Sequence, residues 1–113
     1  MASIKFGTCG WREILGEEFT FHNVRIVCHG IAQFLRQKKI GQRGIIIGHD
    51  TRFLGEQFAR LASEVLAAHG IPVLLCDSET PAPAISYQIL HHRLAGGINI
   101  SASQNPPEYN GVK

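Results

Sequence analysis

Two stretches of this sequence repeat apolar residues at the spacing of an α-helix. Between residues 20 and 39 the apolar positions recur at steps of three and four, which places them on one helix face. A second stretch runs over 54–66 and stops before His69-Gly70, where a glycine commonly follows the last turn. We therefore predict two amphipathic helices, of which the first ends near Gly41.

Short apolar runs separate and flank these helices. We predict strands at Ile4–Gly7, Ile45–Ile47, Ile71–Leu75 and Ile98–Ser101, and a third helix over Ala84–His92. Strands and helices then alternate along the whole chain. This order is typical of a three-layer α/β/α domain with a mixed, mostly parallel four-stranded sheet, because right-handed crossovers place helices on both faces.

Composition narrows the function classes. A chain of 113 residues suffices for one domain with its own core, and its formal charge of +2 is spread without a basic stripe, so we expect no nucleic-acid partner. No apolar stretch approaches the roughly 20 residues that span a bilayer. Since residues 1–5 also lack a secretory signal, we expect a cytoplasmic protein without a membrane partner. Cys9, Cys28 and Cys76 are expected to be free thiols.

Loops that follow parallel strands meet at the carboxyl edge of the sheet, where ligands bind. Polar residues stand beside glycine or proline in three of these loops, at 7–12, 48–52 and 101–107. In the third, Ser103 follows a buried strand, has small neighbours and precedes Asn105-Pro106, so a substrate can approach its hydroxyl closely. Composition alone leaves open that this segment is only a turn and Ser103 a turn residue.

The motifs in these loops resemble those of the α-D-phosphohexomutases. Residues 101–113 are similar to the family's Thr/Ser-Ala-Ser-His-Asn-Pro followed by Asn-Gly-Ile-Lys. Residues 6–12 resemble Phe-Gly-Thr-Asp-Gly-Trp-Arg, and residues 48–52 resemble Gly-Tyr-Asp-Thr-Arg. Thr80–Pro83 and Gly96-Gly97 also stand in the family's order, so the resemblance covers nearly the whole chain. Several motifs in order are stronger support than any one alone.

The resemblance implies an enzyme that moves phosphate between the 1- and 6-positions of a hexose phosphate, through a phosphoserine and a bisphosphate intermediate. The phosphoserine falls on Ser103, whose phosphate would also be a ligand of Mg²⁺. Arg12 would steady a phosphate or a nearby carboxylate, and Lys113 would act as acid or base. Gln104 and Asn105 would bind phosphate, and a hexose 1,6-bisphosphate would be the activator. Without the resemblance, Arg12 and Lys113 would be interpreted as solvated surface charges.

Other polar residues carry a weaker signal. An Asp after a strand is commonly the N-cap of the next helix, and we expect that role for Asp50, with no firm role for Arg52. The six histidines have no spacing typical of a metal site. His91-His92 lies at a helix end, where positive charge is favourable. We assign no histidine a catalytic part.

Three positions beside the expected site depart from the family. Cys9, Glu13 and Gln104 stand where Asp, Gly and His are usual. Gln cannot carry a proton at neutral pH, and Cys9 removes a carboxylate that could orient Arg12. These departures motivate a second hypothesis, in which the chain is a degenerate, non-catalytic mutase domain that serves as an interaction or regulatory module.

Members of the family run through four domains, so we interpret residues 1–113 as a truncated domain I whose partners include the later domains. Trp11 and Pro107–Tyr109 favour the phosphoglucomutase/phosphomannomutase branch. Glucose, mannose and glucosamine phosphates all remain candidate substrates, since the family reads the sugar in a later domain. We expect the isolated chain to be inactive, and to self-associate or be marginally stable because apolar surface is left uncovered.

Overall fold

The computed structural model describes residues 10–79, 81–102 and 109–112. Within them strands and helices alternate up to Ile100, as predicted, and one further strand follows. The elements are β1 (Trp11–Ile14), α1 (Phe21–Gln37), a 3-10 turn (Gly41–Arg43), β2 (Ile45–His49), α2 (Gly55–Ala68), β3 (Val73–Leu75), α3 (Ala82–His92), β4 (Gly96–Ile100) and β5 (Tyr109–Val112).

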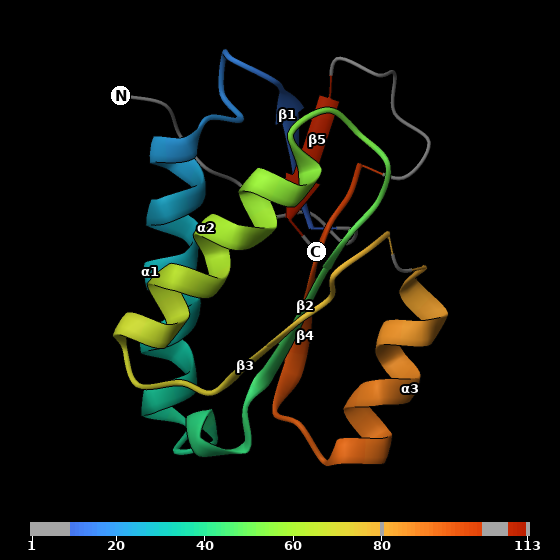
Figure 1. The fold of residues 1–113 in the computed structure, drawn as a ribbon. Coiled ribbons are helices and arrows are strands. Elements are labelled where there is room, and N and C mark those ends of the chain that lie inside the picture. The colour runs from blue at the N-terminus through green and yellow to red at the C-terminus, as the bar shows by residue number, and fades with distance from the viewer. Residues whose placement is uncertain (1–9, 80, 103–108, 113) are drawn as a thin grey trace.

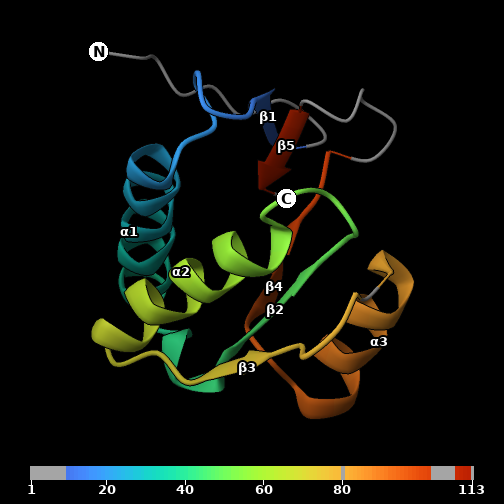
Figure 2. The ribbon, with the colours of Figure 1, turned by 45° about the horizontal axis from the view of Figure 1, so that its top comes forward.

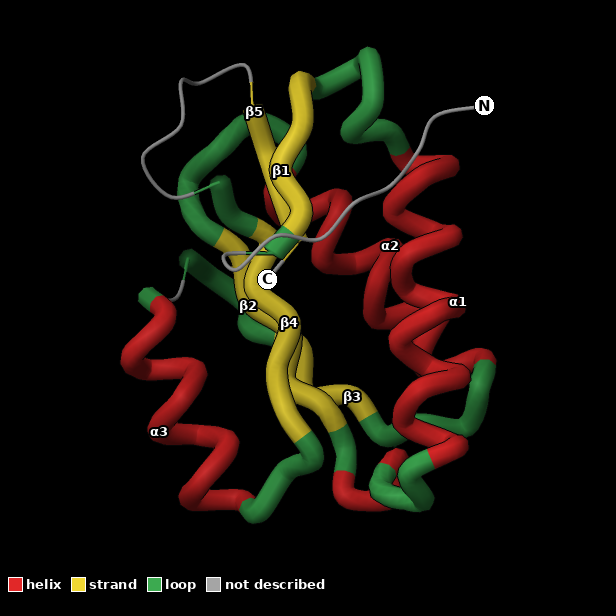
Figure 3. Tube along the Cα trace, turned by 180° about the vertical axis from the view of Figure 1, so that it is seen from behind, coloured by secondary structure: helices red, strands yellow, loops and turns green. Residues whose placement is uncertain are grey.

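The strands form one mixed sheet in the order β1-β5-β4-β2-β3. The pairs β4–β2 and β2–β3 are parallel, whereas β5 runs antiparallel to both β4 and β1. Helices α1 and α2 cover one face of this sheet and α3 covers the other (Figure 1). The view from behind shows the same arrangement (Figure 3). The three-layer α/β/α architecture is therefore confirmed.

The described sheet has five strands, one more than predicted. Strands β1 and β5, which the sequence had indicated as loop, pair with each other from Trp11 opposite Val112 to Ile14 opposite Tyr109. They lie together at one end of the sheet (Figure 2). The prediction missed them because Asn110-Gly111 is typical of a turn and because each partner is distant in sequence. The strand expected at Ile4–Gly7 lies outside the described residues.

Helix α1 begins at a side-chain cap and ends earlier than predicted. The Thr20 hydroxyl accepts a hydrogen bond of 3.1 Å from the Asn23 backbone N–H, which satisfies a free donor of the first turn. At the other end the backbone leaves the helix at Lys39, with a φ of 59°. Gly41 lies in the following 3-10 turn and not at the helix stop, so the predicted end near Gly41 was too late.

Strand β2 lies between β4 and the edge strand β3 and is buried along its whole length. Helix α3 packs closely on its outer face, since a methyl group added to Gly48 would lie 2.7 Å from Ile85 Cδ1. One added to Gly97 of β4 would lie 3.0 Å from both Ile85 and Ile89. Ile85 and Ile89 of α3 therefore face the sheet, and the glycines allow this close approach.

An aromatic cluster joins β1 to the two helices on the other face. The ring of Phe19 lies 4.8 Å from that of Trp11 and 4.7 Å from that of Phe58. Phe58 also stacks on Phe21, at 4.5 Å between ring centroids. Aromatic pairs at these distances contribute beyond the area that they bury. The cluster therefore fixes the position of β1, the strand that carries Arg12.

Several large apolar side chains remain at the surface. Leu90 and Tyr87 on α3 are 81% and 61% exposed, and Phe53, in the loop after β2, is 71% exposed. Leu74 and Leu75 are exposed on β3, which is an edge strand. No helix within the described ranges is both long enough and apolar enough to span a membrane.

Cys28 and Cys76 are both free thiols, as predicted, while Cys9 lies outside the described residues. Cys28 lies on the buried face of α1, and Cys76, just after β3, is partly exposed. Burial disfavours the thiolate and raises the pKa of Cys28 from 9.0 to about 12. Cys28 therefore behaves as a small apolar core residue.

Candidate functional site

Strands β2 and β4 are neighbours and end at the same edge of the sheet. Their register brings His49 opposite Ile100, the last residue of each strand. One residue later, the Asp50 N–H donates a 3.1 Å hydrogen bond to the Ile100 carbonyl. Asp50 and Ser101, the first residues beyond the two strands, are therefore held side by side at the carboxyl edge, where sheets of this kind bind ligands.

A hydrogen bond links these two residues directly. The buried Ser101 hydroxyl donates to Asp50 Oδ2 at 2.8 Å. The other carboxylate oxygen, Oδ1, accepts a bond of 3.0 Å from the backbone N–H of Arg52. Arg52 Nε also lies 3.4 Å from Oδ2, in an ion pair whose side chains are 11% exposed for Arg52 and 30% exposed for Asp50. Charge-assisted bonds of this kind fix a carboxylate in one orientation.

Asp50 does not cap the next helix, contrary to our expectation. The N-cap of α2 is Leu54, which has a φ of 63° and makes no side-chain cap. Three residues separate Asp50 from that position, so its carboxylate bonds instead to the N–H two residues on, as in an Asx-turn. Asp50 therefore organises the loop after β2 and its contact with Ser101.

A glycine brings Arg12 to the same place. The Ser101 N–H donates a 2.9 Å hydrogen bond to the Gly111 carbonyl, and Gly111 lies opposite Arg12 in the β1–β5 pair. A methyl group added to Gly111 would lie 2.5 Å from the Trp11 carbonyl oxygen, 2.8 Å from that of Ser101 and 2.9 Å from Arg12 Cγ. Only glycine fits there, and the Arg12 side chain passes over it. Arg12 thus lies within strand β1, whereas the sequence had indicated a loop at this position.

Of the site residues predicted from sequence, the structure describes Arg12. Ser103, Gln104, Asn105 and Lys113 lie outside the described residues, and their roles stay predictions. The described residues on either side of that segment are well held. Ala102 is fully buried, and Tyr109 belongs to β5.

Sequence reasoning missed two residues of this site. Ser101 was noticed as part of a motif, but its bond to Asp50 could not be seen across 51 positions. Asn110 is fully buried, and its Oδ1 accepts a 2.8 Å bond from the Gly111 N–H. Among the described residues its Nδ2 has no hydrogen-bond partner, so an amide donor remains buried next to the site. The only signal in the sequence was the Asn-Gly pair after the serine motif.

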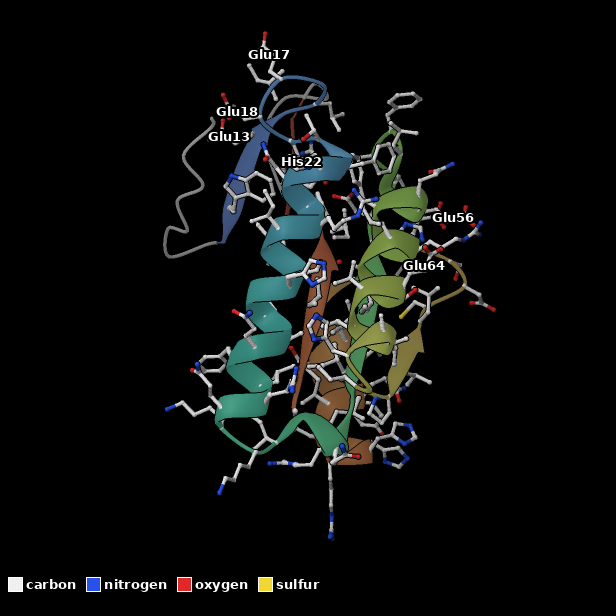
Figure 4. The ribbon with its side chains drawn as sticks, turned by 90° about the vertical axis from the view of Figure 1, so that its left-hand side faces the viewer. Glu13, Glu17, Glu18, His22, Glu56 and Glu64 are labelled. Atoms are coloured by element: carbon white, nitrogen blue, oxygen red, sulfur yellow. The ribbon has the colours of Figure 1, made fainter. Side chains whose placement is uncertain are left out.

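Acidic side chains gather near this end of the domain. Glu13, Glu17 and Glu18 lie around β1 and the turn before α1 (Figure 4). Arg12 and Arg52 are cationic side chains of the edge itself, and the charge of Arg52 is paired with the Asp50 carboxylate. The described part of the site therefore carries charges of both signs.

The described residues do not form a magnesium site of their own. Across the described ranges, no group of three or more His, Cys, Asp or Glu side chains could hold a metal ion. The Asp50 carboxylate, which lies at the edge, is already engaged by Ser101 and Arg52. Since Mg²⁺ is usually held by one or two carboxylates together with phosphate oxygens and water, the described residues would supply at most part of its ligands.

Comparison with known proteins agrees with this architecture. Residues 3–113 match the model of phosphoglucomutase/phosphomannomutase, alpha/beta/alpha domain I. The chain belongs to this family, as its domain I. The resemblance seen in the sequence motifs is thereby confirmed.

Individual relatives agree with that membership. The chain is 35% identical to a phosphoglucomutase of Staphylococcus saprophyticus over 97% of its own length, and 33% identical to a phosphopentomutase of Mus musculus over 99%. A crystal structure from Thermus thermophilus, assigned as a phosphomannomutase, superimposes with a TM-score of 0.94 at 40% identity. The match covers 99% of this chain and 25% of that one. The chain spans about a fifth of the length of the two curated relatives, 20% in each case.

Proposed function

We propose that this phosphohexomutase domain I carries the phosphoserine of a phosphoglucomutase/phosphomannomutase. Such an enzyme interconverts a hexose 1-phosphate and a hexose 6-phosphate. The observation that carries the proposal is the family match over residues 3–113. The roles of Ser103 and Arg12 are proposed from the resemblance of residues 101–113 and 6–12 to the mutase motifs. The bonded pair of Asp50 and Ser101 adds physical support, because it holds the chain two residues before Ser103.

In the proposed reaction, Ser103 carries a phosphoryl group and transfers it to the free hydroxyl of the sugar phosphate, which forms a bisphosphate. That intermediate turns over and returns its other phosphoryl group to Ser103. Arg12 stabilises the negative charge of a phosphate, and Gln104 and Asn105 donate hydrogen bonds to it. Lys113 moves the proton of the attacking or leaving hydroxyl. A hexose 1,6-bisphosphate restores the phosphoserine after loss of the intermediate.

The proposal assigns the metal to the phosphoserine together with carboxylates from other parts of the enzyme. Mg²⁺ would neutralise charge on the phosphoryl oxygens. No step of the reaction is assigned to it, because the described residues lack a set of ligands. A cytoplasmic location and contact with further mutase domains belong to the same proposal.

The sugar is proposed to be a hexose because the sequence motifs are similar to those of the hexose-phosphate enzymes. The phosphopentomutase among the relatives makes a pentose phosphate the main competing substrate. Rates of the full-length enzyme with glucose 1-phosphate, mannose 1-phosphate and ribose 1-phosphate would rank these sugars. A preference for ribose 1-phosphate would overturn the choice of a hexose while leaving the phosphoserine in place.

A degenerate, non-catalytic domain is the second candidate, and Glu13 is the described residue that favours it. Glu13 lies half-buried in β1, opposite Asn110, where the family commonly has glycine. Cys9 and Gln104 are the other two departures.

The variant Gln104→His in the full-length enzyme tests this candidate. If the only effect of Gln104 is the loss of a proton-carrying side chain, the variant raises the mutase rate by about tenfold or more. Absence of turnover in both proteins would favour the non-catalytic candidate.

Phosphate mapping tests the main proposal. The full-length protein is incubated with glucose 1,6-bisphosphate and Mg²⁺, and the modified residue is located by peptide mass spectrometry. We expect one phosphate, on Ser103, that is absent from Ser103→Ala and still maps to Ser103 in Ser101→Ala. A phosphate on Ser101, or one that persists in Ser103→Ala, would refute the assignment.

A further inference from the structure

Two histidines from different helices meet on the surface of the domain, away from the carboxyl edge. His29 Nδ1 on α1 lies 2.8 Å from Nε2 of His69, the residue that caps the end of α2. Their rings are 5.0 Å apart between centroids, and their planes cross at 72°. His29 is exposed and His69 is partly exposed, so the solvent reaches the pair. The proposed mutase reaction uses neither side chain.

The separation of the two nitrogens fits adjacent ligands of one metal ion. With metal–nitrogen bonds of about 2.0–2.1 Å, adjacent ligands at a right angle lie about 2.9 Å apart, and tetrahedral ligands about 3.3 Å apart. The observed 2.8 Å is close to the first value. Neutral imidazole is a preferred ligand of Zn²⁺, Ni²⁺ and Cu²⁺ and a poor one for Mg²⁺ or Ca²⁺.

Binding would need a small rearrangement. In the present contact one ring donates its N–H to the lone pair of the other. That proton would move through solvent to the second nitrogen of the same ring, which leaves both imidazoles neutral and both facing nitrogens free to coordinate. Rotation of the exposed His29 about its side-chain torsions would then direct both lone pairs to one point.

The local charge both favours and limits such a site. The end of α2 carries partial negative charge, and its last turn has no basic side chain to neutralise it. Three cationic side chains oppose this effect, because they repel a metal cation. Arg36 and Lys39 line a hollow of about 310 Å³ together with His69, and Arg25 precedes His29 by one helical turn. We therefore expect affinity to come from imidazole ligation more than from the surrounding field.

Carboxylates from α2 do not contribute. Glu56 and Glu64 lie on the side of that helix turned away from α1 (Figure 4). No third His, Cys, Asp or Glu within the described residues completes a cluster with this pair. Water would fill the remaining coordination positions of a bound ion.

We propose that His29 and His69 form a two-ligand site for a borderline divalent transition-metal ion, which bridges α1 and α2. The site is separate from the Mg²⁺ of the proposed reaction. His69 lies between the end of α2 and the start of β3, at the opposite end of the strands from the carboxyl edge. Sequence spacing could not indicate it, since the two ligands are 40 positions apart.

Calorimetry with Ni²⁺ on the 113-residue chain, at about pH 7.5 in a buffer that does not bind metal, is the direct test. We expect one ion per chain and a higher melting temperature with Ni²⁺. His29→Gln and His69→Gln keep a side chain that can hydrogen-bond but lose the imidazole. Loss of an outer-shell partner alone typically costs about 10–100-fold in metal affinity, so each substitution should weaken binding by at least about tenfold.

Matched controls separate this site from other histidines. His22→Gln changes an exposed histidine on the same helix (Figure 4), and His91→Gln/His92→Gln changes a neighbouring pair on α3. Both controls should bind Ni²⁺ as the unmodified chain does. The nitrogen couplings in the electron paramagnetic resonance spectrum of the Cu²⁺ complex should indicate two imidazole donors.

Four outcomes would overturn the proposal. These are no Ni²⁺ binding, unchanged binding in His29→Gln and His69→Gln, loss of binding in the α3 control, and one ion shared by two chains. Because the two Gln variants and the controls are all surface changes, their melting temperatures without metal should stay close to that of the unmodified chain.

Discussion

Ser101 and Asp50 are 51 positions apart in sequence, yet the serine hydroxyl donates a 2.8 Å hydrogen bond to the aspartate carboxylate. The bond joins the loops after two neighbouring parallel strands. Ser101 is only 6% exposed, so the bond forms where water competes little for either group. The start of the serine-bearing segment is thus fixed to the rigid centre of the sheet, which is how precise active-site geometry is usually supported.

We predict that this pair contributes measurably to stability. A double-mutant cycle with Asp50→Ala and Ser101→Ala, followed by urea unfolding of the chain, should give a coupling energy of about 1–3 kcal/mol. The ion pair of Glu56 and Arg60 serves as control, because it has a similar 3.1 Å distance but side chains that are each 62% exposed. Its coupling should be about 0.3–0.5 kcal/mol. Equal couplings for the two pairs would contradict the role given to Asp50.

Gly111→Ala is predicted to be strongly destabilising. The added methyl group would meet two carbonyl oxygens, of Trp11 and Ser101, at 2.5 and 2.8 Å, and backbone cannot move aside as a flexible side chain can. We expect a loss of about 1–3 kcal/mol or more in the free energy of unfolding. Gly30→Ala is the matched control. That glycine lies in α1 with nothing within 4 Å of an added methyl group, so alanine should stabilise by about 0.5–1 kcal/mol. A neutral Gly111→Ala would mean that β1 and β5 can separate.

The cysteines should differ in reactivity. Because burial raises the pKa of Cys28 to about 12, its thiolate fraction at pH 8 is about one in ten thousand, whereas Cys76 is partly exposed. In a Cys9→Ser background, an aromatic disulfide reagent should modify Cys76 first. The slow reaction of Cys28 should accelerate about tenfold per pH unit up to its pKa, unless unfolding limits it. Rapid modification of both thiols at pH 8 would show that α1 opens readily.

The sequence predicted the helices and central strands well because their signals are local. Val24, Val27 and Leu35 follow the 3.6-residue period, and Ile45–Ile47 is a β-branched run that only a buried position explains. Strands β1 and β5 escaped because their pairing is distant and because Asn110-Gly111 is typical of a turn. In the structure, two backbone carbonyl oxygens lie so close to Gly111 that no side chain fits there. No local sequence pattern reveals such a contact.

The candidate site was predictable only in part, for a related reason. Neighbouring parallel strands bring their carboxyl ends together, so the loops after β2 and β4 were expected to meet. That rule does not say which side chains touch. Asp50 was expected to cap a helix, and its partners Ser101 and Arg52 became visible only when the fold placed the two loops side by side.

The last prediction is that this 113-residue chain has no mutase activity of its own, even with Mg²⁺ and glucose 1,6-bisphosphate. Phosphoryl transfer depends on holding donor, acceptor and metal in line, and positioning with charge stabilisation supplies most of the rate. The chain spans only 20% of the relatives named phosphoglucomutase and phosphopentomutase, and its described residues offer no metal ligand set. A serine hydroxyl without such partners is a weak nucleophile, so the loss should amount to many orders of magnitude. A coupled assay of glucose 6-phosphate formation, with Ser103→Ala as control, measures this. Turnover by the unmodified chain that disappears in Ser103→Ala would refute the prediction and would mean that several copies of the chain together complete the site.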